Sequence, residues 1–214
     1  MDVAVVGGHG KIALKLERLL ADRGDRARGL IRNPDHAADV EALGAEAVVC
    51  DIEDPGADVA AAVAGADAIV FAAGAGPGSG VERKKTVDLD GAIRSIDAAK
   101  ANGIKRFVIV SSMGTADPPS GDDVFEVYLR AKADADKALA ASGLDHTILR
   151  PGRLTDDPGT GRIAAAEHLG RRGRIPRDDV AATLLAVLDE PSTIGQTFEE
   201  ISGDDEIAAA LRAL

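Results

Sequence analysis

The N-terminal residues form the pattern of a strand, a glycine turn and a helix in immediate succession. Residues 3–6 are apolar and mostly β-branched, and three of the next four residues are glycine. From Ile12 to Leu20, apolar residues then recur at three- and four-residue steps, as on one face of a helix. Gly8, Gly10 and Ala13 match a Gly-x-Gly-x-x-Ala pattern, and Gly7 opens an overlapping one. A chain that begins this way is expected to fold as an α/β protein.

The residue types in this turn suit an anionic ligand. The first glycines allow a positive φ, Gly10 lets the backbone approach a pyrophosphate, and Ala13 is small enough for the helix to pack on the strand. The helix N-terminus adds free N–H groups and a positive dipole end. We therefore expect a dinucleotide here, although an ordinary glycine-rich turn is the alternative. The predicted contacts are Gly7, Gly8, His9, Gly10, Lys11 and Ile12.

Composition narrows the class of protein and of partner. The 214 residues predict one domain over 1–214, and a 2% aromatic content means that Ala, Val, Ile and Leu fill the core. The net charge of −11 argues against nucleic acid or a membrane as the main partner. Because Cys50 is the only cysteine, the chain has no disulfide framework, and Cys50 is expected to be buried. The four histidines lack the spacing of metal ligands, so no metal is predicted. Without a signal peptide or an apolar run of ~20 residues, we expect a cytoplasmic protein, monomeric or homodimeric.

Apolar runs and helical patterns alternate along the chain, which predicts a doubly wound parallel sheet covered by helices on both faces. The expected strands are 3–6, 26–31, 47–50, 68–71, 106–110, 146–149 and 196–201, and the expected helices after the first are 37–43, 59–63, 87–102, 124–142, 178–188 and 206–214. Segments 75–86 and 151–176 interrupt this rhythm beyond strand ends. Because open α/β sheets bind ligands there, both are predicted to form a small substrate-side region, the alternative being plain connectors.

Arg32 follows the second expected strand, where an NAD site carries an acid for the ribose 2′-hydroxyl. A guanidinium fits a 2′-phosphate instead, so NADP(H) is predicted over NAD(H), unless Arg32 is simply a solvated surface residue. Asp51, just after the third strand, is expected either to accept from the adenine amino group or to cap the next turn.

Tyr128 and Lys132 form a Tyr-x-x-x-Lys pair on one face of an expected helix. An ammonium near the phenol is expected to lower its pKa from ~10 toward neutrality, making Tyr128 a general acid or base. Lys132 projects along the apolar stripe, where a lysine needs a partner; a packing pair with no catalytic role is the alternative. Ser111 and Ser112, after the fifth strand, offer a hydroxyl for a substrate oxygen or ordinary turn chemistry.

These features together resemble the short-chain dehydrogenase/reductase superfamily, in its atypical NAD(P)H-binding or NmrA-like, epimerase-like branch. The resemblance rests on residues 5–13 and 30–34, the pair Ser111-Ser112, Tyr128-x-x-x-Lys132, residues 87–93 and residues 149–152. It implies a Rossmann-like sheet in the order 3-2-1-4-5-6 with one strand added at the edge. It also implies that Ser112, Tyr128 and Lys132 run proton transfer, with Ser111 possible in place of Ser112, and that Lys132 holds the nicotinamide ribose.

The function predicted is an NADP-dependent oxidoreductase for a small carbonyl, alcohol or conjugated compound. A non-catalytic, redox-sensing NADP(H)-binding protein is the alternative, because several atypical members lack the tyrosine that this chain has. A sugar-nucleotide epimerase or dehydratase needs a larger substrate domain than 214 residues provide. Val6 also stands where many members carry threonine. The predicted cofactor contacts further include Ala72, Ala73, Gly74, Ser111 and Pro151.

Overall fold

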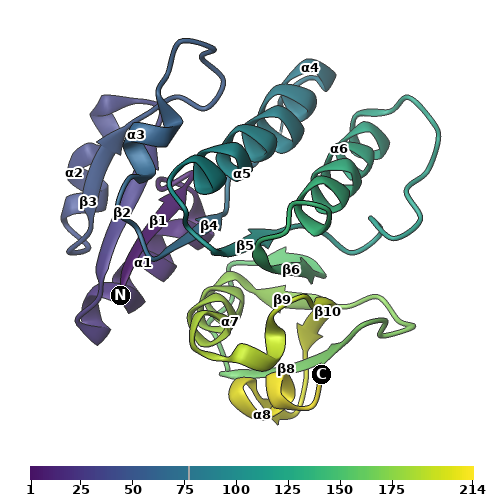
Figure 1. Cartoon of the computed structure of the whole chain (residues 1–214). Helices are drawn as coiled ribbons and strands as arrows, with labels where there is room; N and C mark the ends of the chain where they lie inside the picture. Colours follow the sequence, from purple (N-terminus) through teal and green to yellow (C-terminus); the bar gives the residue numbers. More distant parts are fainter. Residues whose placement is uncertain (77) are drawn as a thin grey trace.

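The computed structural model describes residues 1–76 and 78–214 and is built around a mostly parallel sheet (Figure 1). The described residues form a nine-stranded sheet in the order β11-β8-β10-β6-β5-β4-β1-β2-β3, which confirms the predicted order 3-2-1-4-5-6. Its strands are β1 (Asp2–Val6), β2 (Arg26–Ile31), β3 (Glu46–Val49), β4 (Ala68–Phe71), β5 (Arg106–Val110), β6 (Asp145–Pro151), β8 (Arg162–Ala166), β10 (Thr197–Ser202) and β11 (Asp205–Glu206).

Helices cover both faces of the sheet, as the predicted doubly wound fold requires. They are α1 (Lys11–Arg23), α2 (Ala37–Glu41), α3 (Val59–Val63), α4 (Val81–Arg83), α5 (Gly91–Ala101), α6 (Val124–Ala140), α7 (Arg177–Asp189) and α8 (Ile207–Arg212), with short turns η1 (Pro34–His36) and η3 (Pro191–Thr193) and a π-helix, η2 (Lys84–Asp90). Helices α1, α7 and α8 pack on one face, and α3, α5 and α6 on the other (Figure 1).

The core divides along the pleat of the strands. Val3 and Val5 of β1 face the layer containing α1 and α7, whereas Ala4 and Val6 face the layer containing α5 and α6. Successive side chains of a strand point to opposite faces, so a strand covered on both sides is apolar throughout. All four residues are fully buried, which explains why these strands appear as continuous apolar runs in the sequence.

Two regions differ from the sequence-based expectation. The helix expected from residue 87 begins at Val81, and its first turns continue into the π-helix η2, which includes residues 84–86 of the segment predicted to lie on the substrate side. Segment 151–176 holds β8 and two three-residue strands, β7 (Arg153–Thr155) and β9 (Arg174–Pro176), which pair in parallel as a separate small sheet. These strands are short or alanine-rich, so they lack the β-branched pattern that marks a strand. Pro77, within the predicted segment 75–86, lies outside the described residues.

The edge of the sheet is also more extensive than one added strand. β10 pairs in parallel with β6, as the predicted edge strand does, and β8 then pairs with β10 in the antiparallel sense. β11 pairs antiparallel with β8 and completes this end of the sheet. None of the helices in the described part of the chain is long and apolar enough to cross a membrane.

Candidate functional site

The glycine turn after β1 is held tightly against its neighbours. Gly7 has φ +84°, and a Cβ on it would lie 2.6 Å from the Ala73 Cα, at the end of β4. A Cβ on Gly8 would lie 2.6 Å from the Cα of Gly29 in β2. The turn therefore lies in the angle between β2 and β4, and larger residues at these two positions would push the strands apart.

Helix α1 begins at this turn with backbone donors that no side chain caps. Gly10 is its N-cap residue, no side chain bonds the first turn, and no acidic residue lies there. The first helical backbone bond recorded runs from Leu14 N to the Gly10 carbonyl at 2.9 Å. The preceding N–H groups, including those of Lys11 and Ile12, are oriented for an anion, and this cradle fits the pyrophosphate of a dinucleotide.

The side chains of Lys11 and Ile12 do not join that cradle. Lys11 Nζ is paired with Asp156 at 2.6 Å, and Ile12 is buried in the core beneath the sheet face. These two residues can contribute backbone N–H groups to a ligand. The sequence did not distinguish their backbone from their side-chain contribution.

A cavity of about 290 Å³ opens beside the turn, at the carboxyl ends of β1 to β4. Its lining includes most of the predicted cofactor contacts, namely Gly7, His9, Gly10, Arg32, Asp51, Ala72, Ala73 and Gly74. His9 stacks on His36 with ring centroids 3.6 Å apart, and its Nε2 lies 2.8 Å from Asp39 Oδ2. Cys50 is buried as predicted and also lines this cavity, where burial raises the pKa of its thiol.

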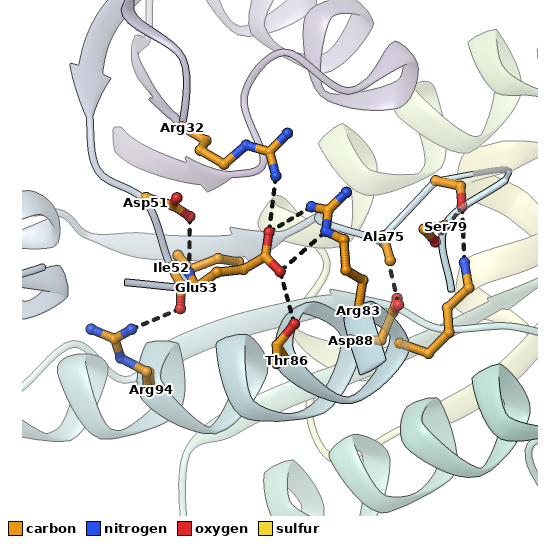
Figure 2. A network of polar contacts seen from close by, with 12 residues as sticks. Arg32, Asp51, Ile52, Glu53, Ala75, Ser79, Arg83, Thr86, Asp88 and Arg94 are labelled. Carbon is orange, nitrogen blue, oxygen red and sulfur yellow. Dashed lines mark hydrogen bonds and ion pairs between the residues drawn. The ribbon is translucent and has the colours of Figure 1, made fainter. Parts of the chain in front are cut away.

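Arg32 reaches this cavity but is already engaged by a carboxylate. Its Nη1 lies 2.9 Å from Glu53 Oε2, which Arg83 Nη2 also contacts at 2.5 Å (Figure 2). Thr86 Oγ1 donates to the second oxygen of Glu53 at 2.8 Å. The hydrogen bonds from Arg83 hold the pKa of Glu53 below its usual range, with smaller contributions from Thr86 and Arg32. Arg32 is therefore more than a solvated surface residue. To bind a phosphate, it has to give up its contact with Glu53.

Asp51 adopts the turn-capping role that the sequence allowed. Its Oδ1 accepts a hydrogen bond from the backbone N–H of Glu53 at 2.9 Å (Figure 2). Asp51 nevertheless lines the cavity beside Arg32, so the same carboxylate can face an adenine amino group. The two alternatives left open by the sequence are compatible in this geometry.

A second cavity, of about 1230 Å³, lies beyond the ends of β5 and β6. Tyr128 and Leu129 of α6 line it, together with Ser111, Ser112 and Pro151 at the strand ends. Residues 152–154, His168, residues 170–174 and Arg177 line it from the other side, and all but Arg177 belong to the segment 151–176 that was predicted to border the substrate. None of the described residues of the other predicted segment, 75–76 and 78–86, is in its lining, and Ala75 and Arg83 line the smaller cavity instead.

The phenol of Tyr128 is not activated in the way expected from the sequence. Burial raises the pKa of Tyr128; Lys132 opposes this effect, and the negative charge of Asp88 adds to it. The expected shift toward neutrality is therefore wrong for this structure. Desolvation of the phenolate outweighs one nearby cation, because that cation has its own carboxylate.

Asp88 is the partner that Lys132 requires in its buried position. Lys132 Nζ lies 3.2 Å from Asp88 Oδ1, and it donates to the carbonyls of Ala73 and Val110 at 3.1 and 3.0 Å. The Lys132 and Asp88 side chains are 4% and 0% exposed. Asp88 Oδ2 accepts from the backbone N–H of Ala75 at 3.2 Å (Figure 2). The pair therefore ties η2 and α6 to the ends of β4 and β5.

Lys84 provides a second cation beside the phenol. Its Nζ lies 5.4 Å from the centre of the Tyr128 ring and donates to the Gly76 carbonyl at 2.9 Å. Both Lys84 and Asp88 belong to the π-helix η2, a rare geometry that is common at functional sites. Neither of these residues, nor Glu53, is predicted from the sequence to belong to the site. The charged Asp88 between the apolar Val87 and Leu89 is the one sequence signal that could have indicated it.

The two serines at the end of β5 separate into different environments. Ser112 lies close enough to Tyr128 to favour the phenolate, and its Oγ donates to the Met113 carbonyl at 3.1 Å. Ser111 is 3% exposed and lies beside Asp136, whose pKa is raised by burial although Ser111 opposes the shift. Of the two, Ser112 is the hydroxyl next to the phenol.

Comparisons with known proteins agree with the dinucleotide cradle and the overall fold. The NAD(P)H-binding family model matches residues 7–191. The chain belongs to the NAD(P)H-binding family. It is 44% identical over 215 residues to the uncharacterized sugar epimerase YhfK of Bacillus subtilis, with all of both chains covered. Its relatives support the predicted placement in the atypical, epimerase-like branch.

Two solved structures extend this likeness over the whole fold. A Bacillus halodurans protein described as an NAD-dependent epimerase/dehydratase superposes with a TM-score of 0.94 at 40% identity, covering 100% of both chains. The anaerobillin reductase ChuY of Escherichia coli O157:H7 has a TM-score of 0.81 at 27% identity, with 96% of this chain and 98% of that chain covered. NAD(P)H binding and an oxidoreductase-like family are thus established for the chain.

Proposed function

We propose that the protein is an NADP(H)-dependent oxidoreductase that acts on a carbonyl, an alcohol or a conjugated compound. The observation that carries this proposal is the position of Tyr128. It lies on the wall of the larger cavity, with Ser112 beside it and Lys132 on the next turn of α6. A proton donor next to a cavity near a dinucleotide cradle is the minimum that such a reaction requires.

The protein groups have complementary tasks in this proposal. The nicotinamide, when bound, supplies or accepts the hydride. Tyr128 gives its phenolic proton to the substrate oxygen during reduction and takes it back during oxidation. Its raised pKa keeps the phenol protonated at neutral pH, which favours reduction. Ser112 holds the substrate oxygen. Lys132 keeps a positive charge behind the phenol and would hold the nicotinamide ribose by exchanging one of its three present partners, Asp88 and the carbonyls of Ala73 and Val110.

We further propose that NADP(H) is preferred over NAD(H). Arg32 lines the cofactor cavity, and Glu53 keeps Arg83 and Thr86 as partners if Arg32 turns toward a 2′-phosphate. The Arg32 side chain is 56% exposed, so its reorientation disturbs no packed core. A guanidinium that exchanges one carboxylate for a phosphate retains a charge-assisted hydrogen bond.

The whole chain is proposed to act as one NAD(P)-binding domain over 1–214, with residues from 75–86 and 151–176 on the substrate side. Hydrogen exchange measures this placement. NADPH should protect the amides near residues 7–13 and 72–75, whereas a substrate should protect those of residues 152–177. Protection by substrate confined to the β2–β3 edge would contradict it.

The names of the relatives indicate two different activities, reduction and sugar epimerisation. ChuY is described as a reductase, which supports the proposal, whereas YhfK carries a sugar epimerase name. An epimerase retains its dinucleotide through the cycle and releases none that is reduced. The protein purified without added cofactor should therefore contain little NAD if it is an oxidoreductase. Stoichiometric bound NAD would favour the epimerase.

A cofactor-sensing role is the second candidate, and it is favoured by the contacts of Lys132, whose ammonium is already engaged by Asp88, Ala73 and Val110. In this case the phenol and Lys132 pack η2 against α6 and report cofactor binding to a partner. Cofactor binding is expected under both hypotheses. Only substrate-dependent oxidation of NADPH distinguishes them.

The experiment has two stages. Thermal shifts with NADPH, NADP, NADH and NAD rank the cofactors, because a ligand of the native state raises the melting temperature. NADPH oxidation is then measured with a panel of carbonyl and conjugated compounds, using wild type, Tyr128→Phe and, as a packing control on the same helix outside the cavity lining, Val127→Ala. Tyr128→Phe should lower turnover by ~10²–10⁴-fold and leave the NADPH affinity unchanged. Wild-type turnover by Tyr128→Phe would assign the proton to another group.

A further inference from the structure

The larger cavity is strongly basic in a chain that is strongly acidic overall. The net charge of the chain is −11. The cavity is lined by five arginines and one histidine against a single carboxylate; these are Arg153, Arg171, Arg172, Arg174, Arg177, His168 and Glu199. Glu199 is 9% exposed and accepts from the backbone N–H of Leu169 at 2.9 Å, so its charge is used within the wall.

Within the described part of the chain, four of these arginines have no carboxylate partner. Among the described residues, no ion pair is recorded for the side chains of Arg153, Arg171, Arg172 or Arg174, and all four are exposed. Arg177, the fifth, pairs with Asp156 at 2.6 Å. Elsewhere in the chain, cavity-lining and exposed arginines such as Arg32, Arg83 and Arg26 do have acidic partners. Arg18, Arg94, Arg106 and Arg212 also have no ion pair among the described residues, but none of them lines either cavity, whereas these four arginines line the same one.

The small sheet brings two of the four into direct register. Arg153 of β7 and Arg174 of β9 are paired residues of the parallel ladder. Like charges at paired positions destabilise a sheet, so this placement has an energetic cost unless an anion lies between them. The backbone there is closely packed, because a Cβ on Gly152 would lie 2.6 Å from the Gly173 carbonyl and a Cβ on Gly173 2.8 Å from Ile201. This close packing fixes the backbone from which the side chains of Arg153 and Arg174 extend.

The opposite wall is apolar and contains an exposed aromatic ring. Phe71, Phe107 and Phe198 are at most 1% exposed, whereas Phe125 is 61% exposed and stacks near Tyr128, with ring centroids 5.9 Å apart. Met113, Leu129 and Leu154 line the cavity as well. An exposed ring at the mouth of a cavity of about 1230 Å³ is suited to a ligand with a bulky apolar body.

We propose that the substrate of this cavity is a bulky, largely apolar organic acid, whose carboxylate or phosphate group is bound by Arg153, Arg174 and the neighbouring Arg171 and Arg172. The acidic end binds the arginines, and the apolar body spans the cavity so that its reducible group faces Tyr128. Guanidinium forks match both oxyanions. That the bound acid is a substrate rests on the proposed function; that the arginines bind an acid does not.

Binding of a fluorescent acid that cannot be reduced tests this inference independently of catalysis. The probes are 1-pyrenebutyrate and its methyl ester, titrated against the NADPH-saturated protein and the protein alone. Wild type should bind the acid about tenfold more tightly than the ester, the value expected for one charge-assisted hydrogen bond. Arg153→Gln/Arg174→Gln should lose this preference while keeping the affinity for the ester. Inorganic phosphate that displaces the acid would identify phosphate as a competing headgroup.

The control removes the same charge away from the cavity. Arg18→Gln/Arg162→Gln changes two exposed arginines of α1 and β8 and should retain the preference. If the first double variant does not fold, Arg171→Gln/Arg172→Gln in the turn before β9 provides the same measurement. Equal affinity for acid and ester in wild type, no binding of either probe, or equal loss in the control would overturn the inference. Failure of the proposed function would appear separately, as absent NADPH oxidation with the acid preference intact.

Discussion

Glu17 should make the stability of this protein depend strongly on pH. Its side chain is fully buried in α1, and neither carboxylate oxygen has a hydrogen-bond partner among the described residues. Burial raises the pKa of Glu17 from 4.5 to about 8. The folded protein therefore keeps a proton that the unfolded chain loses above about pH 4.5. The free energy of unfolding should therefore fall as the pH rises from about 4.5 to about 8. Above about pH 8, Glu17 should cause no further change.

The size of the effect follows from the displacement of the pKa. Each pH unit between the two values changes the free energy of unfolding by about 1.4 kcal/mol, which gives about 5 kcal/mol over the full interval. Glu17→Gln removes the ionisation and retains the shape of the protonated acid. The variant should thus match wild type near pH 4 and exceed its free energy of unfolding by about 5 kcal/mol at pH 8.5.

Urea unfolding at half-unit steps from pH 4 to pH 9 measures the difference directly. Glu41→Gln, an exposed change on α2, is the matched control and should follow wild type at every pH. Glu200 is also fully buried, and burial raises its pKa to about 8, but its contribution cancels when variant and wild type are compared. A difference between Glu17→Gln and wild type that stays constant with pH would refute the reasoning.

Three further outcomes are expected around the cofactor and the phenol. Arg32→Asp should weaken NADPH and spare NADH in a titration of both; unchanged dissociation constants would remove Arg32 from the 2′-phosphate site. Lys132→Met should lower the free energy of unfolding by about 3–5 kcal/mol because it leaves Asp88 buried and unpaired, and Lys132→Met/Asp88→Asn should recover part of the loss; no destabilisation in denaturant would contradict the pairing. Because the pKa of Tyr128 is raised, alcohol oxidation should accelerate into the alkaline range while carbonyl reduction does not; parallel pH profiles would argue against Tyr128 as the proton carrier.

Features of this protein that depend on residues close together in the sequence could be predicted, whereas those that depend on contacts between distant segments could not. The strand order and the glycine turn could be predicted because apolar runs, Gly7, Gly10 and Ala13 act locally and leave regular patterns. The carboxylate that pairs with Lys132 could not, because Asp88 meets it only after two distant helices pack. The pKa of Tyr128 depends on burial and on that same carboxylate, so spacing along one helix gave the wrong direction.

The arginines of the larger cavity are carried on a single excursion of the chain. Strands β6 and β10 are neighbours in the sheet, yet the chain leaves the end of the first and forms β7, β8, β9 and α7 before it returns as the second. The dinucleotide cradle lies at the other half of the sheet, between β1, β2 and β4. Mutation in residues 152–174 can therefore alter which molecules enter the cavity while the cofactor half keeps its sequence. Because of this division, substitutions in about one tenth of the chain could change the substrate during evolution, while the nucleotide-binding residues stay the same.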